Sequence, residues 1–300
     1  MTQTTSQDTY RTAEVAVRGG TLHTGIWGPT DPDAPTILAV HGVTASHKAW
    51  PYLAAALPEV RIIAPDLRGR GRSNSLPAPY GMTSHAEDLA AVLAELAPGP
   101  VVVVGHSMGG FASLVLANLF PERVRSLVLV DGGLPLQVPE GLSDEEVISS
   151  VLGAAAERLN ATFPSREVYR SFWRQHPAFS EDWSPLVDAY VEYDLTGEEP
   201  ELRPATRYQA MAEDTADLHR GASLLKALDE LAVEAEVLRA PRGLLNEPAA
   251  LYSPGYLDAW AEKLPSLRVR EVPEVNHYTI VMGEAGAAAV ARRVREALES

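Results

Sequence analysis

The chain of 300 residues has a composition typical of a soluble globular protein, with 46% hydrophobic residues, 22% charged residues and no cysteine. The absence of cysteine excludes disulfides, thiolate metal sites and a cysteine nucleophile. The formal net charge of −15 argues against a nucleic-acid partner, because no basic stripe is available to neutralise phosphates. The length suits one large α/β domain with an insertion, or two small domains.

The N-terminal stretch, residues 1–12, is predicted to be a flexible tail. It lacks the basic and apolar regions of a signal peptide, and no apolar run reaches the roughly 18 residues that a membrane span requires. We therefore expect a cytoplasmic protein with no membrane span. A chain from which a leader had been trimmed would start in the same way.

Short apolar runs between turn residues predict the first strands. Two of them flank Gly19-Gly20 and predict a β-hairpin over 15–27. The following runs predict buried strands over 36–40 and 61–65, with a short helix over 50–57 between them.

A loop rich in glycine and arginine, 66–73, follows the second buried strand. Its composition would suit a phosphate cradle, but three arginines beside an aspartate favour a turn that pairs with itself. The next amphipathic run predicts a helix over 84–96. Thr83 or Ser84 is expected to cap it, with Glu87 completing a capping box around Ser84.

The most informative stretch is 101–111, which reads Val-Val-Val-Val-Gly-His-Ser-Met-Gly-Gly-Phe. Four β-branched residues predict a strand buried on both faces, and the apolar run over 111–120 predicts a helix. The turn between them, 105–109, has the pattern G-x-S-x-G, which in this context presents a serine hydroxyl at a helix N-terminus. We expect Ser107 to be a nucleophile; the alternative is an incidental serine in a Gly-rich turn.

Beyond this unit the alternation of strands and helices is interrupted once. A strand over 124–130 ends in Asp131, and from 134 to 221 strand-like runs are absent while prolines separate short helical stretches, which predicts an inserted helical cap. The elements predicted after it are a helix over 222–232, a strand over 237–240, a helix over 254–264, a strand over 267–272 and a helix over 284–298. This order predicts a doubly wound, mostly parallel sheet.

With these elements in place, the chain resembles the α/β-hydrolases. The resemblance rests on four sequences that follow predicted strands, namely Val40-His41-Gly42, the 66–73 loop, Gly105 to Gly110 and Asn276-His277-Tyr278. It implies an eight-stranded, mostly parallel sheet in a core domain of residues 13–133 and 222–300. The tail and the 134–221 cap lie outside it.

The resemblance also implies the roles of individual residues. Ser107 corresponds to the nucleophile and His277 to its general base, and the backbone amides of Val43 and Met108 correspond to the oxyanion hole. His41 and His106 are expected to shape the site. No histidine has the spacing of a metal ligand, so we expect neither a metal nor a cofactor.

The acid of this set departs from the commonest pattern of the family, because no aspartate follows the predicted strand over 237–240. Asp131 occupies the alternative position that some branches of the family use. Glu247 lies further along the loop after 237–240, and Asn246 beside it could orient the histidine only without charge. We favour Asp131 and keep Glu247 as the alternative acid.

The function expected from these residues is a serine hydrolase that cleaves a carboxylic ester, lactone or related acyl bond. The aromatic residues of the cap suit an apolar or aromatic small molecule, but they would equally suit the core of the cap. Three alternatives stay open: a C–C bond hydrolase of ring-fission-type diketones, a cofactor-free haloperoxidase- or perhydrolase-like enzyme, and a non-catalytic ligand-binding receptor. The oligomeric state is left open.

Overall fold

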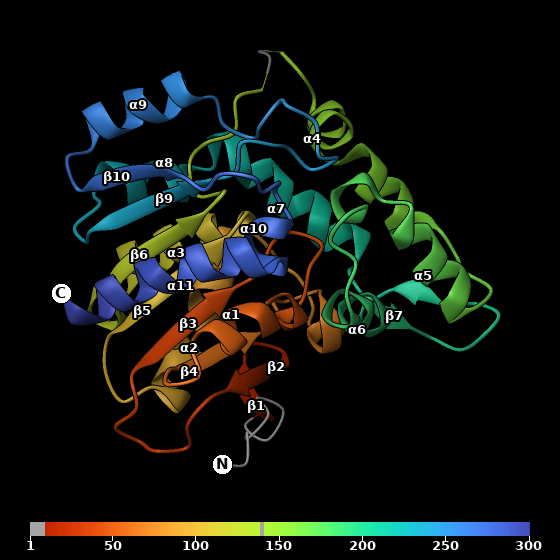
Figure 1. The fold of residues 1–300 in the computed structure, drawn as a ribbon, viewed down its shortest axis with the longest axis horizontal. Helices are drawn as coiled ribbons and strands as arrows, with labels where there is room; N and C mark the ends of the chain where they lie inside the picture. Colours follow the sequence, from red (N-terminus) through yellow and green to blue (C-terminus); the bar gives the residue numbers. More distant parts are fainter. Residues whose placement is uncertain (1–9, 139–140) are drawn as a thin grey trace.

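An eight-stranded sheet forms the centre of the computed structural model, which describes residues 10–138 and 141–300. The strands run in the spatial order β1-β2-β4-β3-β5-β6-β9-β10 (Figure 1). Their bounds are β1 (Arg11–Val17), β2 (Gly20–Trp27), β3 (Thr36–Val40), β4 (Arg61–Pro65), β5 (Val101–His106), β6 (Val124–Val130), β9 (Ala235–Arg239) and β10 (Leu267–Glu271).

Only β2 runs against its neighbours, pairing antiparallel with β1 and with β4, whereas the other adjacent strands pair in parallel. This confirms the predicted mostly parallel, eight-stranded sheet. Because the carboxyl ends of parallel strands meet at one edge of a sheet, the turns after β3, β5 and β6 lie close together there.

The side chains of β5 show why this strand is apolar throughout. Val101 and Val103 belong to the hydrophobic core on one face of the sheet, and Val102 and Val104 to the core on the other face. Successive side chains of a strand point to opposite faces, so a strand covered on both faces needs apolar residues at every position. The strand is accordingly buried along its whole length.

Helices cover both faces of the sheet. Helices α2, α3 and α8 pack against one another on one face, and α1, α10 and α11 on the other, where α11 crosses in front of the strands in Figure 1. Helix α9 packs on the edge strand β10. The bounds are α1 (Pro51–Ala56), α2 (Met82–Leu96), α3 (Met108–Leu119), α8 (Ala222–Asp229), α9 (Pro254–Lys263), α10 (Thr279–Met282) and α11 (Glu284–Glu299). No helix in the described part of the chain is both long enough and apolar enough to cross a membrane.

We use the term cap segment for residues 134–221, which leave the sheet after β6. Its helices are α4 (Asp144–Asn160), α5 (Arg166–Arg174), α6 (Pro185–Tyr193) and α7 (Tyr208–Arg220), with α4 to α6 to the right of the sheet in Figure 1. The expectation that the segment contains no strands is wrong, because β7 (Leu195–Thr196) pairs with β8 (Arg203–Pro204). These strands are two residues long, too short to leave a run in the sequence.

The aromatic residues of the cap segment mainly form its own core. Tyr169, Trp173 and Phe179 are buried, and Trp173 has neighbouring rings within about 5 to 7 Å, the range of edge-to-face and stacked pairs. Phe172, in contrast, is 40% exposed. Both Phe172 and Trp173 line a cavity, so packing in the core of the cap segment and a place at a cavity wall are compatible for one residue.

The start of α2 differs from the predicted capping box. The helix begins at Met82 after Gly81, with no side-chain cap, and Ser84 accepts a hydrogen bond from Arg18 instead of capping. The amides of Gly81 and Met82 donate to Asp214 and Asp217 of α7. Two carboxylates from a distant helix thus satisfy the donors that the local sequence was expected to satisfy.

Candidate active site

The turn between β5 and α3 holds Ser107 in an unusual backbone conformation. Its φ of 52° and ψ of −126° lie in a region that costs free energy for a residue with a side chain. The two glycines of the pattern allow the close packing that maintains it: a Cβ on Gly109 would lie 2.0 Å from the Val40 carbonyl oxygen, and one on Gly105 2.5 Å from the Gly109 carbonyl oxygen. In this conformation Ser107 directly precedes α3, at the N-terminus of the helix.

His277 and Asp131 come together beside this turn. The Nδ1 atom of His277 lies 2.7 Å from Oδ2 of Asp131, and both side chains are buried. Asp131 directly follows β6 with a φ of 44°, and its Oδ1 accepts a hydrogen bond from the Ala240 amide after β9. The carboxylate is thereby fixed between two strand ends with one oxygen directed at the histidine ring.

Glu247, the alternative acid, is engaged elsewhere. Its Oε2 accepts a hydrogen bond of 2.7 Å from the Leu245 amide within its own loop. Asn246 accepts a hydrogen bond from Asn276 rather than from the ring of His277. Of the candidates for the third site residue, the structure brings Asp131 alone into hydrogen-bond contact with His277 within the described residues.

Ser107 and His277 line one small cavity of about 40 Å³, together with Val43, His106 and Tyr278. The hydrogen bonds of the described residues include none between the Ser107 hydroxyl and the His277 ring. Such a bond is often long or poorly aligned in an enzyme without substrate, so Ser107 and His277 stay candidates for a nucleophile and its base.

The backbone amides of Val43 and Met108 flank the serine from two loops. Met108 is the first residue of α3, where a helix amide has no acceptor within the helix, and Val43 lies in the turn after β3. Neither amide donates a hydrogen bond to a protein acceptor among the described residues.

Arg70 contacts both of these residues, and no local sequence pattern predicts this role. Its Nε donates 2.9 Å to the Val43 carbonyl oxygen, and its Nη2 lies 3.7 Å from the Met108 sulfur. A salt bridge of 2.5 Å ties the guanidinium to Asp214 of α7, which also accepts from His85. Burial raises the pKa of Asp214, but Arg70 and His85 outweigh this and hold that pKa at about 2.

The expectation that the arginines of the 66–73 loop pair within the turn holds only in part: Arg70 Nη1 donates to the Arg68 carbonyl oxygen, but the salt bridges of Arg68 and Arg70 lie outside the loop. Arg68 makes a bidentate salt bridge with Asp88 of α2, and Arg70 pairs with Asp214; both arginines are fully buried. Asp66 accepts from the Arg72 amide rather than from an arginine side chain of the loop. The loop has a structural role, as expected, but its partners come from distant helices.

His106 and His41 support the site as neutral groups. Burial and the nearby His277 lower the pKa of His106 well below its usual value. Its Nε2 donates to the His277 carbonyl oxygen at 2.8 Å, because a carbonyl oxygen can only accept. Burial also lowers the pKa of His41 to about 4, and the His41 Nε2 accepts from the Leu67 amide. Each ring thus ties one site loop to another.

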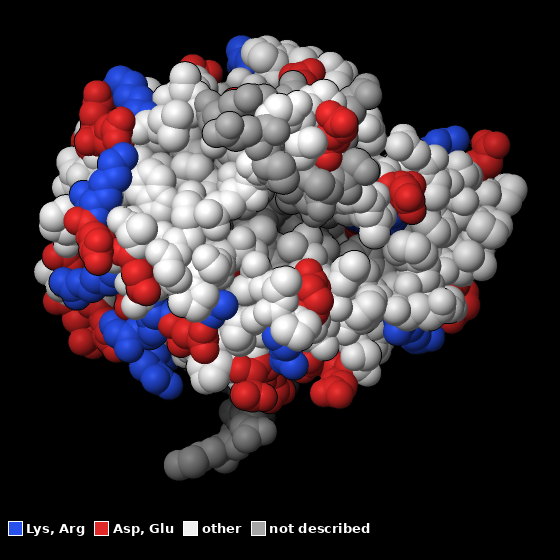
Figure 2. Space-filling view, turned by 90° about the horizontal axis from the view of Figure 1, so that it is seen from above, with Lys and Arg blue, Asp and Glu red and all other residues white. Residues whose placement is uncertain are grey.

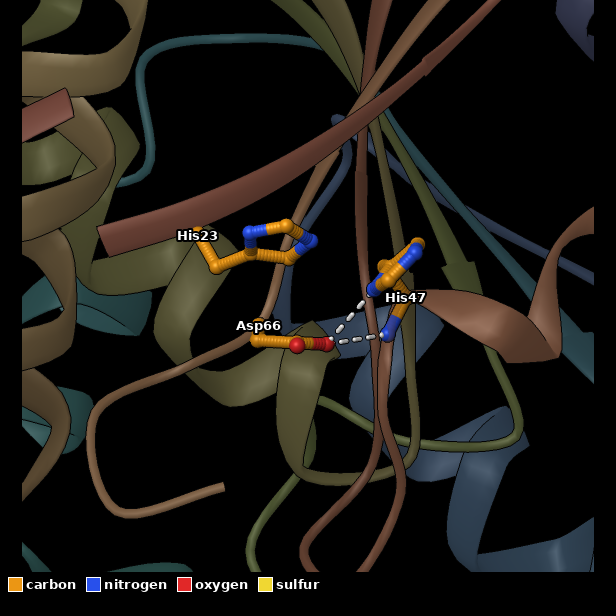
Figure 3. Close-up of side chains that lie close together, drawn as sticks. All are labelled: His23, His47 and Asp66. Atoms are coloured by element: carbon orange, nitrogen blue, oxygen red, sulfur yellow. Dashed lines mark hydrogen bonds and ion pairs between the residues drawn. The ribbon is translucent and has the colours of Figure 1, made fainter. Parts of the chain in front are cut away.

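A second group of potential ligand atoms comes from His23, His47 and Asp66 (Figure 3). Both ring nitrogens of His47 already have partners, Nδ1 at 2.8 Å from Asp66 and Nε2 at 2.8 Å from the Tyr10 hydroxyl. Asp66 also accepts from the His47 amide and from the Tyr193 hydroxyl. These hydrogen bonds explain why His47 and Asp66 lie together: both side chains have partners within the protein.

A larger cavity of about 430 Å³ adjoins the small one and is lined by residues of the cap segment and of the loop after β9. The two cavities share Leu152, Ala155, Leu244 and Tyr278 as wall residues. Seen from above, charged side chains gather along the left and lower edges of the molecule, and white, uncharged residues lie on the left and lower sides of a hollow near the middle (Figure 2).

Comparison with known proteins matches residues 35–235 to a family described as alpha/beta hydrolase fold. Lipase LipV of Mycobacterium tuberculosis is 41% identical over 133 residues, which are 44% of this chain and 49% of that protein. The chain thus matches about half the length of this relative. The 2-(acetamidomethylene)succinate hydrolase of Mesorhizobium japonicum is 27% identical over 245 residues, 81% of this chain and 82% of that protein.

Among solved structures, that of E-2-(acetamidomethylene)succinate hydrolase superposes with a TM-score of 0.79. The match has 21% identity and covers 97% of this chain and all of that one. At this identity the likeness shows the fold. The names of the sequence relatives support a hydrolase.

Proposed function

Because this chain belongs to the alpha/beta hydrolase fold family, we propose that it is a serine hydrolase that cleaves an ester, lactone or related acyl bond of a small molecule. Ser107, His277 and Asp131 are its catalytic residues in this proposal. The cap segment serves as the cover of the binding cavity.

The proposed reaction starts with attack of the Ser107 oxygen on the acyl carbon. His277 accepts the hydroxyl proton and later donates it to the leaving group, and Asp131 orients the ring and stabilises its protonated form. The amides of Val43 and Met108 bind the oxygen that becomes negative; losing one such donor typically costs about 3 kcal/mol in the transition state. Water then attacks the acyl-enzyme in a second round with the same groups.

A single observation carries the proposal. A serine in a strained turn and a buried histidine–aspartate pair line, or directly support, the same small cavity. Strain of this kind persists only where surrounding structure imposes it, and it is concentrated at functional sites. The unpaired amides of Val43 and Met108 add the anion-binding half of the site.

The test is the Ser107→Ala variant. A fluorophosphonate probe should label the wild-type protein at Ser107, and the variant should lose both the labelling and the hydrolysis of p-nitrophenyl butyrate, because no other hydroxyl would replace the nucleophile. Ser113→Ala is the matched control, since Ser113 is buried in α3 with its hydroxyl bonded to the Gly109 carbonyl oxygen. Hydrolysis retained in Ser107→Ala, at the rate of the control, would disprove the mechanism.

A further inference from the structure

The larger cavity, lined by the cap segment and the loop after β9, shares four wall residues with the small cavity that Ser107 lines. Because the two share four wall residues, a substrate whose acyl carbon lies at Ser107 can place the rest of its acyl chain along that shared wall. Most of the lining of the larger cavity is apolar. The polar side chains in it are therefore the groups that would select among acyl chains.

Arg158 of α4 is the cationic side chain of this lining, and it is only 4% exposed. Its Nη1 donates to the Tyr169 hydroxyl at 2.6 Å and to Asp194 at 2.5 Å. Its Cζ lies 5.0 Å from the centre of the Trp173 ring. These contacts hold the guanidinium in one orientation at the cavity wall.

The second terminal nitrogen of Arg158, Nη2, is buried and has no hydrogen-bond partner among the described residues. A buried charged donor left unpaired costs free energy, so a native protein retains one where a ligand or water completes it. Asp194 does not complete it, because that carboxylate is engaged by Nη1 and by the Tyr169 hydroxyl.

The other polar side chains of the cavity make no hydrogen bond to Nη2 among the described residues. Burial, together with the charge of Arg158, lowers the pKa of His176 to about 4, so this ring is neutral at pH 7 and has one acceptor nitrogen. That nitrogen is Nδ1, which accepts a hydrogen bond from the Ala178 amide, so Nε2 carries the proton. Glu247 accepts from the Leu245 amide. A ligand or a water molecule would therefore supply the acceptor for Nη2.

We propose that Arg158 binds a carboxylate at the far end of the substrate's acyl chain, so that the enzyme selects acyl compounds that carry a second, ionised acid group. A guanidinium pairs with a carboxylate through strong charge-assisted hydrogen bonds. This inference rests on the proposed function, which places the acyl carbon of the substrate at Ser107, and it adds the class of substrate. Arg158 is a specificity-determining residue in it.

The first experiment compares two esters of equal leaving group, mono-p-nitrophenyl glutarate and neutral p-nitrophenyl butyrate. Arg158→Gln should lower kcat/KM for the glutarate ester on the order of 10- to 100-fold, mainly through KM, since a hydrogen bond to a charged group is lost. The rate with the butyrate ester should stay within about threefold if the loss is confined to substrate binding. Arg174→Gln, an arginine of α5 whose side chain is 49% exposed, is the matched control and should change neither ester.

Two outcomes would overturn the inference: a wild-type enzyme that prefers the neutral ester, or an Arg158→Gln variant that loses both esters to the same extent. Because Arg158→Gln leaves Asp194 buried without its partner, the double variant Arg158→Gln/Asp194→Asn provides a second, uncharged replacement of the pair. It should show the same loss of preference for the glutarate ester with the butyrate rate retained.

Calorimetric binding of glutarate to Ser107→Ala separates this inference from the proposed function, because it requires no turnover. Glutarate should bind Ser107→Ala and lose at least about tenfold in affinity when Arg158→Gln is added. If neither ester is hydrolysed but glutarate binds through Arg158, the proposed function fails and the anion site stands. If the butyrate ester is hydrolysed but glutarate does not bind, the proposed function stands and the anion site fails.

Discussion

Three buried histidine–aspartate pairs in the described residues have nearly the same geometry but different surroundings. They are His277–Asp131 at 2.7 Å, His47–Asp66 at 2.8 Å and His85–Asp214 at 2.9 Å. Distance and burial therefore do not distinguish the pair that we assign to catalysis. The difference lies in what each pair faces.

The ring of His47 is bonded at both nitrogens, to Asp66 and to the Tyr10 hydroxyl, so it can neither accept nor deliver a proton without breaking a contact. Asp214 shares its charge between His85 and Arg70. His277 uses one nitrogen for Asp131 and lines the cavity that Ser107 also lines. A histidine–aspartate pair is thus a candidate for catalysis where its second nitrogen faces a cavity with a nucleophile.

The largest expected effect is on kcat, when the charge of the aspartate is removed from the His277–Asp131 pair and, for comparison, from the His47–Asp66 pair. Asp131→Asn should lower kcat on the order of 10⁴-fold, because an amide favours the wrong tautomer of the ring and does not stabilise its protonated form. Asp66→Asn should leave kcat of the folded enzyme within about threefold while lowering the free energy of unfolding by about 1–3 kcal/mol, the cost of an unsatisfied buried partner. Steady-state kinetics and urea unfolding measure the two quantities.

Glu247→Gln is the matched control for the choice of acid, and its kcat should change less than about threefold for an acid that does not contact the base. A large loss in Glu247→Gln together with a mild effect of Asp131→Asn would transfer the role to Glu247. Similar losses of kcat in Asp66→Asn and Asp131→Asn would remove the distinction between the pairs.

An intermediate effect is expected from the third pair, which is connected to the site through Arg70. Arg70→Gln should lower kcat by about 10- to 100-fold, since displacing a catalytic group by about 1 Å can cost as much. Arg68→Gln is the neighbouring control: it breaks the buried pair with Asp88 and should lower stability with little change in kcat of the folded enzyme. Equal effects of the two variants on kcat would show that Arg70 has no special role in positioning the Val43 and Met108 amides.

The smallest effect is a change in the pH dependence of stability. The pKa of Asp214 is about 2 in the folded protein and returns to its usual value near 3.8 on unfolding, so the unfolded chain binds the proton first as the pH falls. Asp214 therefore stabilises the folded protein above about pH 4 by roughly 2 kcal/mol, and this contribution is lost between about pH 4 and 2.

Asp214→Asn should be less stable than wild type at pH 7 and should lose less stability between pH 4 and 2. Urea unfolding at a series of pH values provides the measurement. If the free energy of unfolding of Asp214→Asn fell between pH 4 and 2 as steeply as that of the wild type, Asp214 would not be the source of this pH dependence.

The comparison of the pairs also shows where sequence reasoning reached its limit. The strands and most helices could be placed because alternation of apolar residues and turn residues is local information. The position of the third site residue could only be narrowed to Asp131 and Glu247, because the choice depends on which strand end lies next to His277. In the folded chain β6 and β9 are adjacent, and Asp131 is held between their ends by the Ala240 amide.

The chain alone determined the doubly wound sheet, the turn that presents Ser107 and the expectation of a hydrolase, because these depend on periodicity and on glycines at fixed offsets. Tertiary structure alone decided which acid contacts the base, which carboxylates begin α2, and which helices neutralise Arg68 and Arg70. Each of these is a contact between side chains far apart in sequence, and the free energy of a buried charge depends on the partner that folding brings to it.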